Sequence, residues 1–143
     1  MACGRAGPGT LPSMRCPCGS TDPLASCCGR YLDGEAPAPT PEALMRSRYT
    51  AFSLGTPEAI EYLVVTHHPD HREPDLAQGL AATVRAIDAW EGLEVLSASE
   101  DGDAGTVTFV ACYRQGRERG ELRERSSFVR EGGRWFYTSG SLS

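Results

Sequence analysis

The sequence predicts an α+β fold in which several helices come first and an antiparallel sheet follows. Apolar residues recur at helical spacing through residues 41–88, whereas from residue 90 onward they alternate in steps of two. Helices followed by a run of strands are typical of α+β domains. A third observation sets the N-terminal part apart, because four of the six cysteines fall within residues 16–28.

Three segments are expected along the chain. Residues 1–13 are rich in glycine and proline and show no periodicity, which predicts a disordered tail. Residues 14–34 contain the cysteine cluster, and we assign them to a small metal-binding knuckle. Residues 35–143 form the α+β domain, which begins with the proline-rich linker EAPAPTP, a composition that is stiff and extended.

The sequence of this domain contains clear helix N-terminal signals. The tripeptide Thr-Pro-Glu occurs at 40–42 and again at 56–58, and each copy supplies a capping threonine, a proline at the first helical position and an acidic first turn. Gly55 ends the first helix, and Pro69 must stop the second. A third helix is expected from about residue 74 to 88, where Gly79 costs about 1 kcal/mol relative to alanine.

The strands are predicted from the change in the spacing of apolar residues, from helical periodicity to alternation. A strand begins near Leu93, the acidic stretch 98–105 reads as a turn region, and alternation continues through 106–113 and 122–129. Gly132-Gly133 is typical of a two-residue hairpin turn. Such a turn sets three pairs of residues opposite each other: Glu131 and Arg134, Arg130 and Trp135, and Phe128 and Tyr137.

Composition and charge restrict the function classes. The net charge is −5, which gives little attraction to nucleic-acid phosphates, so nucleic-acid binding ranks last among our hypotheses. The sequence contains no run of about 18 apolar residues, as a membrane-spanning helix requires. The first fifteen residues lack the apolar stretch of a secretory signal, so we expect a cytoplasmic protein. In a reducing compartment, clustered cysteines favour metal binding over disulfides.

The cysteine cluster reads CPCGSTDPLASCC, in which a C-x-C pair and a C-C pair are separated by eight residues. Four thiolates in this arrangement predict one structural zinc ion, with iron on the same ligands as the alternative. A redox dithiol is disfavoured because the C-x-x-C spacing is missing. We treat Cys3 and Cys112 as incidental. The expected metal ligands are Cys16, Cys18, Cys27 and Cys28.

CPCGS followed by CCG resembles the SEC-C motif, which is named for the C-terminal zinc-binding segment of the SecA translocase ATPase. From Cys16 onward, nearly the whole chain resembles the YchJ-like family of uncharacterised proteins. The matching pieces are EALMRSRYTAF at 42–52, Tyr62-Leu63, His68-Pro69, Trp90 to Leu93, VTFVACYR at 107–114, ERSSFVREGGRWFY at 124–137, and Gly140. Two features depart from the family: many relatives carry a second, C-terminal SEC-C motif, and many have tryptophan where this sequence has His67.

The resemblance implies an NTF2-like fold, a cone in which helices cover one face of a curved antiparallel sheet. Such sheets often pair, so a homodimer is one implied assembly. The cone can also hold a pocket, for which the candidate residues are Arg46, Arg48, Tyr49, His68, Trp90, Glu124 and Ser126. We expect Glu124 to need a donor from Arg46 or Arg48, and we interpret His67 as a core histidine.

Two functions remain open at this point. The favoured hypothesis is a non-enzymatic protein whose zinc knuckle contacts a protein partner, with Arg15, Arg30 and Tyr31 facing an acidic surface. The alternative is an NTF2-like binder of small molecules, or an enzyme that uses His68 or Glu124 for proton abstraction or hydration chemistry. In that enzyme Arg48 and Tyr49 would hold an anionic substrate. A cone filled by Phe52, Phe109 and Trp135 would argue against the alternative.

Overall fold

The computed structural model describes residues 15–20 and 22–142. The predicted tail, residues 1–13, and its Cys3 lie outside the described residues. The elements are, in chain order, η1 (Leu24–Ser26), α1 (Gly29–Leu32), α2 (Pro41–Leu54), α3 (Pro57–Val65), η2 (Pro69–His71), α4 (Leu76–Ala86), β1 (Ala89–Asp101), β2 (Ala104–Gln115), β3 (Glu118–Glu131) and β4 (Arg134–Leu142). Helices precede strands, so the predicted α+β class is confirmed.

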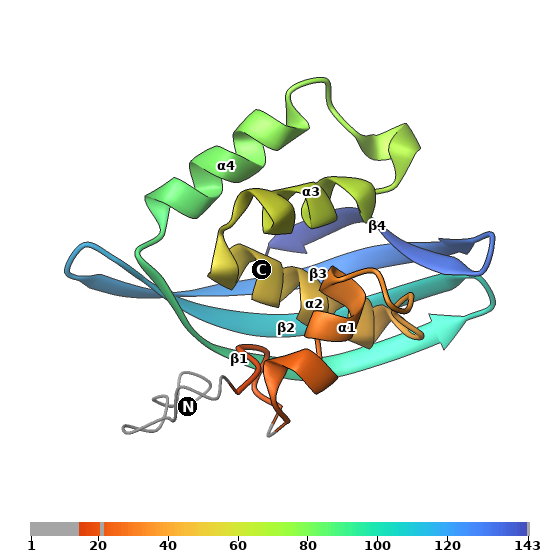
Figure 1. Cartoon of the computed structure of the whole chain (residues 1–143), viewed down its shortest axis with the longest axis horizontal. Helices are drawn as coiled ribbons and strands as arrows, with labels where there is room; N and C mark the ends of the chain where they lie inside the picture. The colour runs from red at the N-terminus through yellow and green to blue at the C-terminus, as the bar shows by residue number, and fades with distance from the viewer. Residues whose placement is uncertain (1–14, 21, 143) are drawn as a thin grey trace.

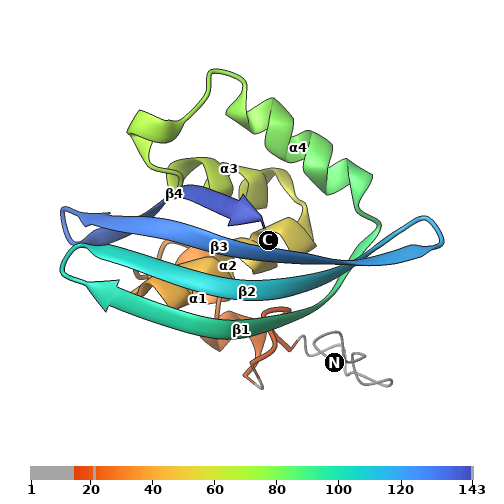
Figure 2. The ribbon, with the colours of Figure 1, turned by 180° about the vertical axis from the view of Figure 1, so that it is seen from behind.

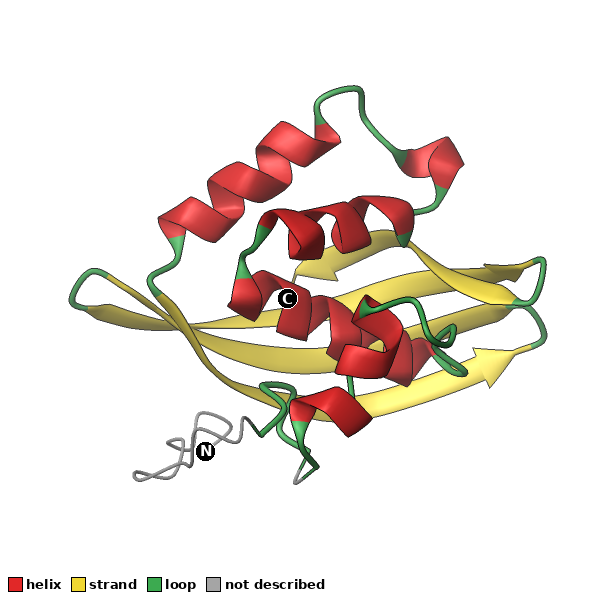
Figure 3. Ribbon diagram, in the orientation of Figure 1, coloured by secondary structure: helices red, strands yellow, loops and turns green. Residues whose placement is uncertain are grey.

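The four strands form one antiparallel sheet in the order β1-β2-β3-β4. The sheet is long and curved, and α2, α3 and α4 lie on one of its faces, with α4 farthest from the strands (Figure 1). Seen from behind, the strands lie in front of these helices (Figure 2). The short helical turns of the cysteine segment sit at the β1 edge, next to α2 (Figure 3). This is the architecture of an NTF2-like cone with an N-terminal knuckle.

The hairpin between β3 and β4 has the predicted register. Gly132 and Gly133 have φ angles of 58° and 79°, which only glycine adopts readily, and they form the two-residue turn. All three predicted cross-strand pairs occur: Glu131 with Arg134, Arg130 with Trp135, and Phe128 with Tyr137.

The two Thr-Pro-Glu helix starts are also confirmed. The side chain of Thr40 accepts a hydrogen bond from the backbone N–H of Ala43 at 3.0 Å, and Thr56 does the same for Ala59 at 3.0 Å. These caps satisfy N–H groups that have no partner inside the helix. They fix α2 and α3 as consecutive helices with only Gly55 and Thr56 between them.

Three element boundaries differ from the sequence prediction. α3 ends at Val65, so His67 follows the helix and pairs with Tyr137 of β4 in an isolated bridge. The helix α4 is shorter than expected at both ends. The acidic stretch 98–105 is mostly strand, and the β1–β2 turn narrows to Gly102 and Asp103. In each case pairing to a neighbouring strand or a following loop overrides the local signal.

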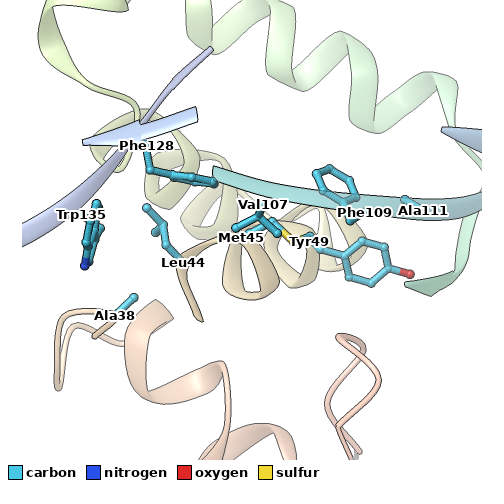
Figure 4. Close-up of a cluster of buried hydrophobic side chains, with 9 residues drawn as sticks. All are labelled: Ala38, Leu44, Met45, Tyr49, Val107, Phe109, Ala111, Phe128 and Trp135. Atoms are coloured by element: carbon cyan, nitrogen blue, oxygen red, sulfur yellow. The ribbon is translucent and has the colours of Figure 1, made fainter. Parts of the chain in front are cut away.

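The main core lies between α2 and the inner face of the sheet (Figure 4). Leu44, Val107 and Phe128 are almost fully buried there. Trp135 packs at one end of this core near Ala38, and Tyr49 and Phe109 lie at the other (Figure 4). A second cluster joins α2, α3 and α4 through Ala51, Ala59, Leu63 and Leu80.

None of the helices in the described part of the chain combines the length and apolar character needed to cross a membrane.

Candidate metal centre and cone cavity

The structure gathers the four cysteines of the knuckle into one cluster. The sulfur atoms of Cys16, Cys18, Cys27 and Cys28 all lie within 4.8 Å of one another. The Sγ atoms of Cys18 and Cys27 are 3.7 Å apart. Zinc–thiolate bonds of about 2.3 Å in a tetrahedron place the sulfur atoms about 3.8 Å apart. The cluster therefore fits a single tetrahedral ion, and its soft donor set suits zinc.

Local backbone contacts create this cluster. Arg15 and Pro23 form a short antiparallel bridge, and the N–H of Cys16 donates to the carbonyl of Asp22 at 3.0 Å. This contact folds the chain back so that η1 and α1 bring the C-C pair beneath the C-x-C pair. Cys28 is the residue before α1 and begins its first turn.

The knuckle packs directly against the cone. Cys16, Cys18 and Cys28 are at most 4% exposed and form a small buried cluster, against which Leu93 of β1 packs. The Sγ of Cys16 lies 3.6 Å from the hydroxyl oxygen of Thr50 on α2. Arg46, also on α2, donates from Nη1 to the carbonyl of Cys18 at 2.8 Å. The cysteine cluster therefore packs against α2 and is not a separate appendage.

Hydrogen bonds among the thiols shift the pKa values of the clustered cysteines in opposite directions. The Cys16 and Cys28 thiols donate toward Cys18 and lower the pKa of its thiol well below the usual range. The pKa of the Cys28 thiol is correspondingly raised by its bonds to Cys16 and Cys18, with burial adding to the effect. The lowered pKa favours the thiolate form of Cys18, which is the form in which cysteine binds a metal ion.

A cavity of about 330 Å³ opens inside the cone. Most of its lining is apolar, from α2, α4 and the inner face of the sheet. Phe52 and Phe109 form part of the wall and leave the space open, while Trp135 packs elsewhere in the core. The described lining residues are Met45, Arg48, Tyr49, Phe52, His67, Leu76, Leu80, Thr83, Trp90, Phe109, Ala111, Leu122, Glu124, Ser126, Phe128 and Tyr137.

Arg48 is the cation of this cavity. It is 8% exposed, and its Nη1 donates to the carbonyl of Leu63 at 2.8 Å and to the hydroxyl of Thr66 at 2.7 Å. Its guanidinium carbon lies 4.5 Å from the centroid of the Tyr137 ring, a cation–π geometry. Burial lowers the pKa of Arg48 to about 10, so the group stays charged at neutral pH.

Glu124 and Ser126 lie on the inner face of β3, as the alternation predicted. The hydroxyl of Ser126 donates to Oε2 of Glu124 at 2.7 Å. The carboxylate also lies beside the hydroxyl of Tyr137, whose pKa is raised to about 12 by burial and by the charge of Glu124. A Cβ at Gly140 would overlap this carboxylate, so the Glu124 side chain would have to move to accommodate any other residue there.

The expected partnership between Glu124 and Arg46 is wrong. Arg46 pairs with Glu42 at 2.9 Å and reaches the knuckle, so it does not line the cavity. Arg48 does lie in the cavity near Glu124, but the two side chains form no ion pair.

Tyr49 and Trp90 line the cavity side by side, with ring centroids 5.9 Å apart in an edge-to-face arrangement. Burial raises the pKa of Tyr49 to about 12, so its hydroxyl stays protonated at neutral pH.

Comparison with known proteins agrees with this architecture. Residues 40–140 match the family model described as the YchJ middle NTF2-like domain. The chain belongs to the YchJ-like family. UPF0225 proteins from Chromobacterium violaceum and Streptomyces coelicolor are 46% and 45% identical to it, over 90% and 92% of this chain and 93% and 98% of theirs.

Solved structures with the SEC-C motif resemble this YchJ-like chain over most of its length. The solution structure of a SEC-C motif protein from Rhodopseudomonas palustris has a TM-score of 0.81 at 38% identity, covering 91% of this chain and 99% of that one. A crystal structure of a SEC-C motif protein from Psychrobacter arcticus has a TM-score of 0.74 at 26% identity, covering 92% and 84%. The knuckle and the NTF2-like domain therefore occur together as one family architecture.

Of the two adjacent histidines in the YchJ-like chain, His68 was predicted to line the pocket, but the structure places His67 there instead. His68, the predicted candidate, is 5% exposed and lies outside the cavity lining, with its Nε2 2.8 Å from Oε2 of Glu131. His67 lines the cavity instead. Its Nε2 donates to the carbonyl of His71 at 3.0 Å, which leaves Nδ1 as an acceptor. That buried Nδ1 has no hydrogen-bond partner in the part of the chain that the structure describes.

Tyr137 is another polar lining residue that was not among the predicted pocket candidates. The predicted hairpin already set it opposite Phe128, which shares the inner face with Ser126 and Glu124. Side chains of directly paired residues lie on the same face of a sheet. The register alone could therefore have placed Tyr137 in the cavity.

Proposed function

We propose that this protein binds a small, largely apolar molecule inside its cone cavity. One observation carries the proposal: the buried side chain of Arg48 and the half-buried side chains of Glu124 and His67 lie among the apolar lining of an open space of about 330 Å³. Ligand sites commonly combine this size with a few placed polar groups in an apolar wall. In a purely structural core, polar groups are paired more completely than these are.

Filling the cavity tests this proposal. Ala111 is 1% exposed on the cavity wall, so Ala111→Phe places a ring in the open space. Ala82→Phe adds the same atoms on the exposed side of α4 and is the matched control. A set of aromatic acids, amides and alcohols is titrated against each protein by two-dimensional NMR. Members that bind the wild type and Ala82→Phe, but not Ala111→Phe, support the proposal. Equal binding to all three proteins contradicts it.

The knuckle supplies the second part of the proposal, one structural zinc ion held by Cys16, Cys18, Cys27 and Cys28. Three of the four sulfurs belong to buried residues, which leaves no open coordination position for a substrate. Native mass spectrometry distinguishes zinc from iron by mass. One zinc per chain, lost in a Cys27→Ser variant, supports this assignment, and a metal-free chain contradicts it.

A protein-interaction role for the knuckle is the second candidate function. Its outer surface carries exposed Arg30, whose guanidinium carbon lies 5.1 Å from the centroid of the Tyr31 ring. A basic and aromatic pair of this kind suits an acidic protein surface. A partner captured by the wild type, but lost both on chelation and in an Arg30→Ser variant, would favour this role. Capture that survives both changes would exclude it.

A further inference from the structure

The guanidinium of Arg48 has hydrogen-bonding capacity that the protein does not use. Only Nη1 is occupied, by the carbonyl of Leu63 and the hydroxyl of Thr66. Nε and Nη2 have no hydrogen-bond partner among residues 15–20 and 22–142. Arg48 is 8% exposed and lines the cavity, so these N–H groups belong to a side chain that a molecule in the cavity can contact.

Arg48 also forms no ion pair with any residue that the structure describes. Glu124 lies close enough to influence it, but the carboxylate accepts from Ser126 and forms no ion pair with Arg48. Burying an ion without a partner costs several kcal/mol. Among the described lining residues, Arg48 is the one basic side chain apart from His67, whose pKa is lowered by burial and by Arg48 itself. An anion in the cavity would neutralise this charge.

The shape of the unused site indicates which anion fits. The guanidinium carbon lies 4.5 Å from the centroid of the Tyr137 ring, and this contact together with the two hydrogen bonds of Nη1 restricts the orientation of the guanidinium plane. Two adjacent N–H groups on a fixed plane match the two oxygens of a carboxylate. Glu124 adds a negative charge to the same cavity and disfavours a dianion. The remaining wall is apolar and accepts a hydrocarbon or aromatic body.

We propose that the ligand of the cone cavity is a small apolar monocarboxylate, whose carboxylate pairs with Nε and Nη2 of Arg48 and whose body lies against Phe52, Trp90 and Phe109. This inference rests on the proposed function, because it names the chemical class of the molecule that the cavity binds.

Three related probes test the class: phenylacetate, its neutral analogue phenylacetamide, and the dianion phenylmalonate. Their dissociation constants are measured by calorimetry and by two-dimensional NMR. We expect phenylacetate to bind wild-type protein at least tenfold more tightly than either of the other two. Equal or tighter binding of phenylacetamide overturns the carboxylate inference but leaves small-molecule binding in the cavity intact. If no probe binds at millimolar concentration and Ala111→Phe changes no titration, the proposed function fails as well.

Variants of Arg48 provide the second arm. Arg48→Met is expected to weaken phenylacetate binding at least tenfold and to leave phenylacetamide binding unchanged. Arg85→Met, which removes an exposed arginine of α4 outside the cavity, is the matched control and is expected to change neither. If Arg48→Met does not fold, Arg48→Lys replaces it, because lysine keeps the positive charge but lacks the two adjacent N–H groups of the guanidinium. Arg48→Lys is expected to reduce the preference for phenylacetate over phenylacetamide. An unchanged preference in Arg48→Met or Arg48→Lys overturns the inference.

Discussion

Raising the free zinc concentration is expected to stabilise the entire chain, not the knuckle alone. The reason is the packing of the knuckle on α2, through Cys16 against Thr50 and through the hydrogen bond from Arg46 to the Cys18 carbonyl. A domain whose metal site folds with it gains stability by mass action when the metal binds only the folded state.

The magnitude follows from the size of the chain. Once the site is saturated, each tenfold rise in free zinc adds about 1.4 kcal/mol to the free energy of unfolding. Unfolding entropy is about 2.1 cal/mol/K per residue, so the 143 residues give about 0.3 kcal/mol/K. The melting temperature is therefore expected to rise by about 5 °C for each tenfold increase in free zinc.

Differential scanning calorimetry in zinc buffers measures this slope. Cys27→Ser is the informative variant, because Cys27 is the most exposed of the four ligands and its replacement disturbs packing least. It is expected to abolish the slope. Ser26→Ala, one residue earlier on the knuckle surface, is the control and keeps it. A melting temperature independent of zinc, or a separate low-temperature transition for the knuckle, would refute the argument that the metal centre buttresses the cone.

Three further predictions concern the cavity. Gly140→Ala is expected to destabilise the protein by about 1–2 kcal/mol, because its Cβ displaces the Glu124 carboxylate. The same substitution is expected to destabilise a Glu124→Ala variant less. Urea unfolding of the two single variants and the double variant measures the two effects. The pKa of His67 is lowered by burial and by Arg48, so the unfolded chain takes up a proton more readily than the folded protein, and the free energy of unfolding falls as pH drops below about 6.5. In urea titrations between pH 7.5 and 5.5, His67→Asn is expected to show a smaller fall than the wild type. An equal fall in both proteins would contradict this. Zinc and phenylacetate are expected to raise each other's affinity by the same factor in reciprocal titrations, and independent affinities would show that the two sites are uncoupled.

Local signals predicted the parts of the fold that local chemistry determines. The repeated Thr-Pro-Glu starts and the Gly132-Gly133 turn each contain the groups that specify their geometry, so α2, α3 and the β3–β4 register came out correctly. The cysteine spacing likewise brought four sulfurs together within a single short segment. In each case the interacting groups are close in the sequence.

The cavity was predicted less completely because its lining depends on contacts between distant segments. Arg46 and Arg48 are two positions apart on α2, and residues with this spacing do not share a helix face. That rule shows that only one of the two arginines can face Glu124, but it does not say which one. His67 faces the cavity because its backbone pairs with Tyr137, 70 residues later in the numbering, and no local pattern reports such a bridge.

From the positions of Arg46 and Arg48 we expect the cysteine cluster and the cavity to be coupled. One arginine reaches out of α2 to the backbone of the knuckle, and the other reaches into the cone. A rotation or shift of α2 would move both guanidinium groups together, since a helix transmits such motion as a rigid unit. Thr50, one turn after Arg46, adds a second contact to the cysteines and opposes that rotation. The buried cation of the cavity is costly, so its position must be held by its surroundings. We expect the knuckle, packed on α2 through Arg46 and Thr50, to provide that constraint.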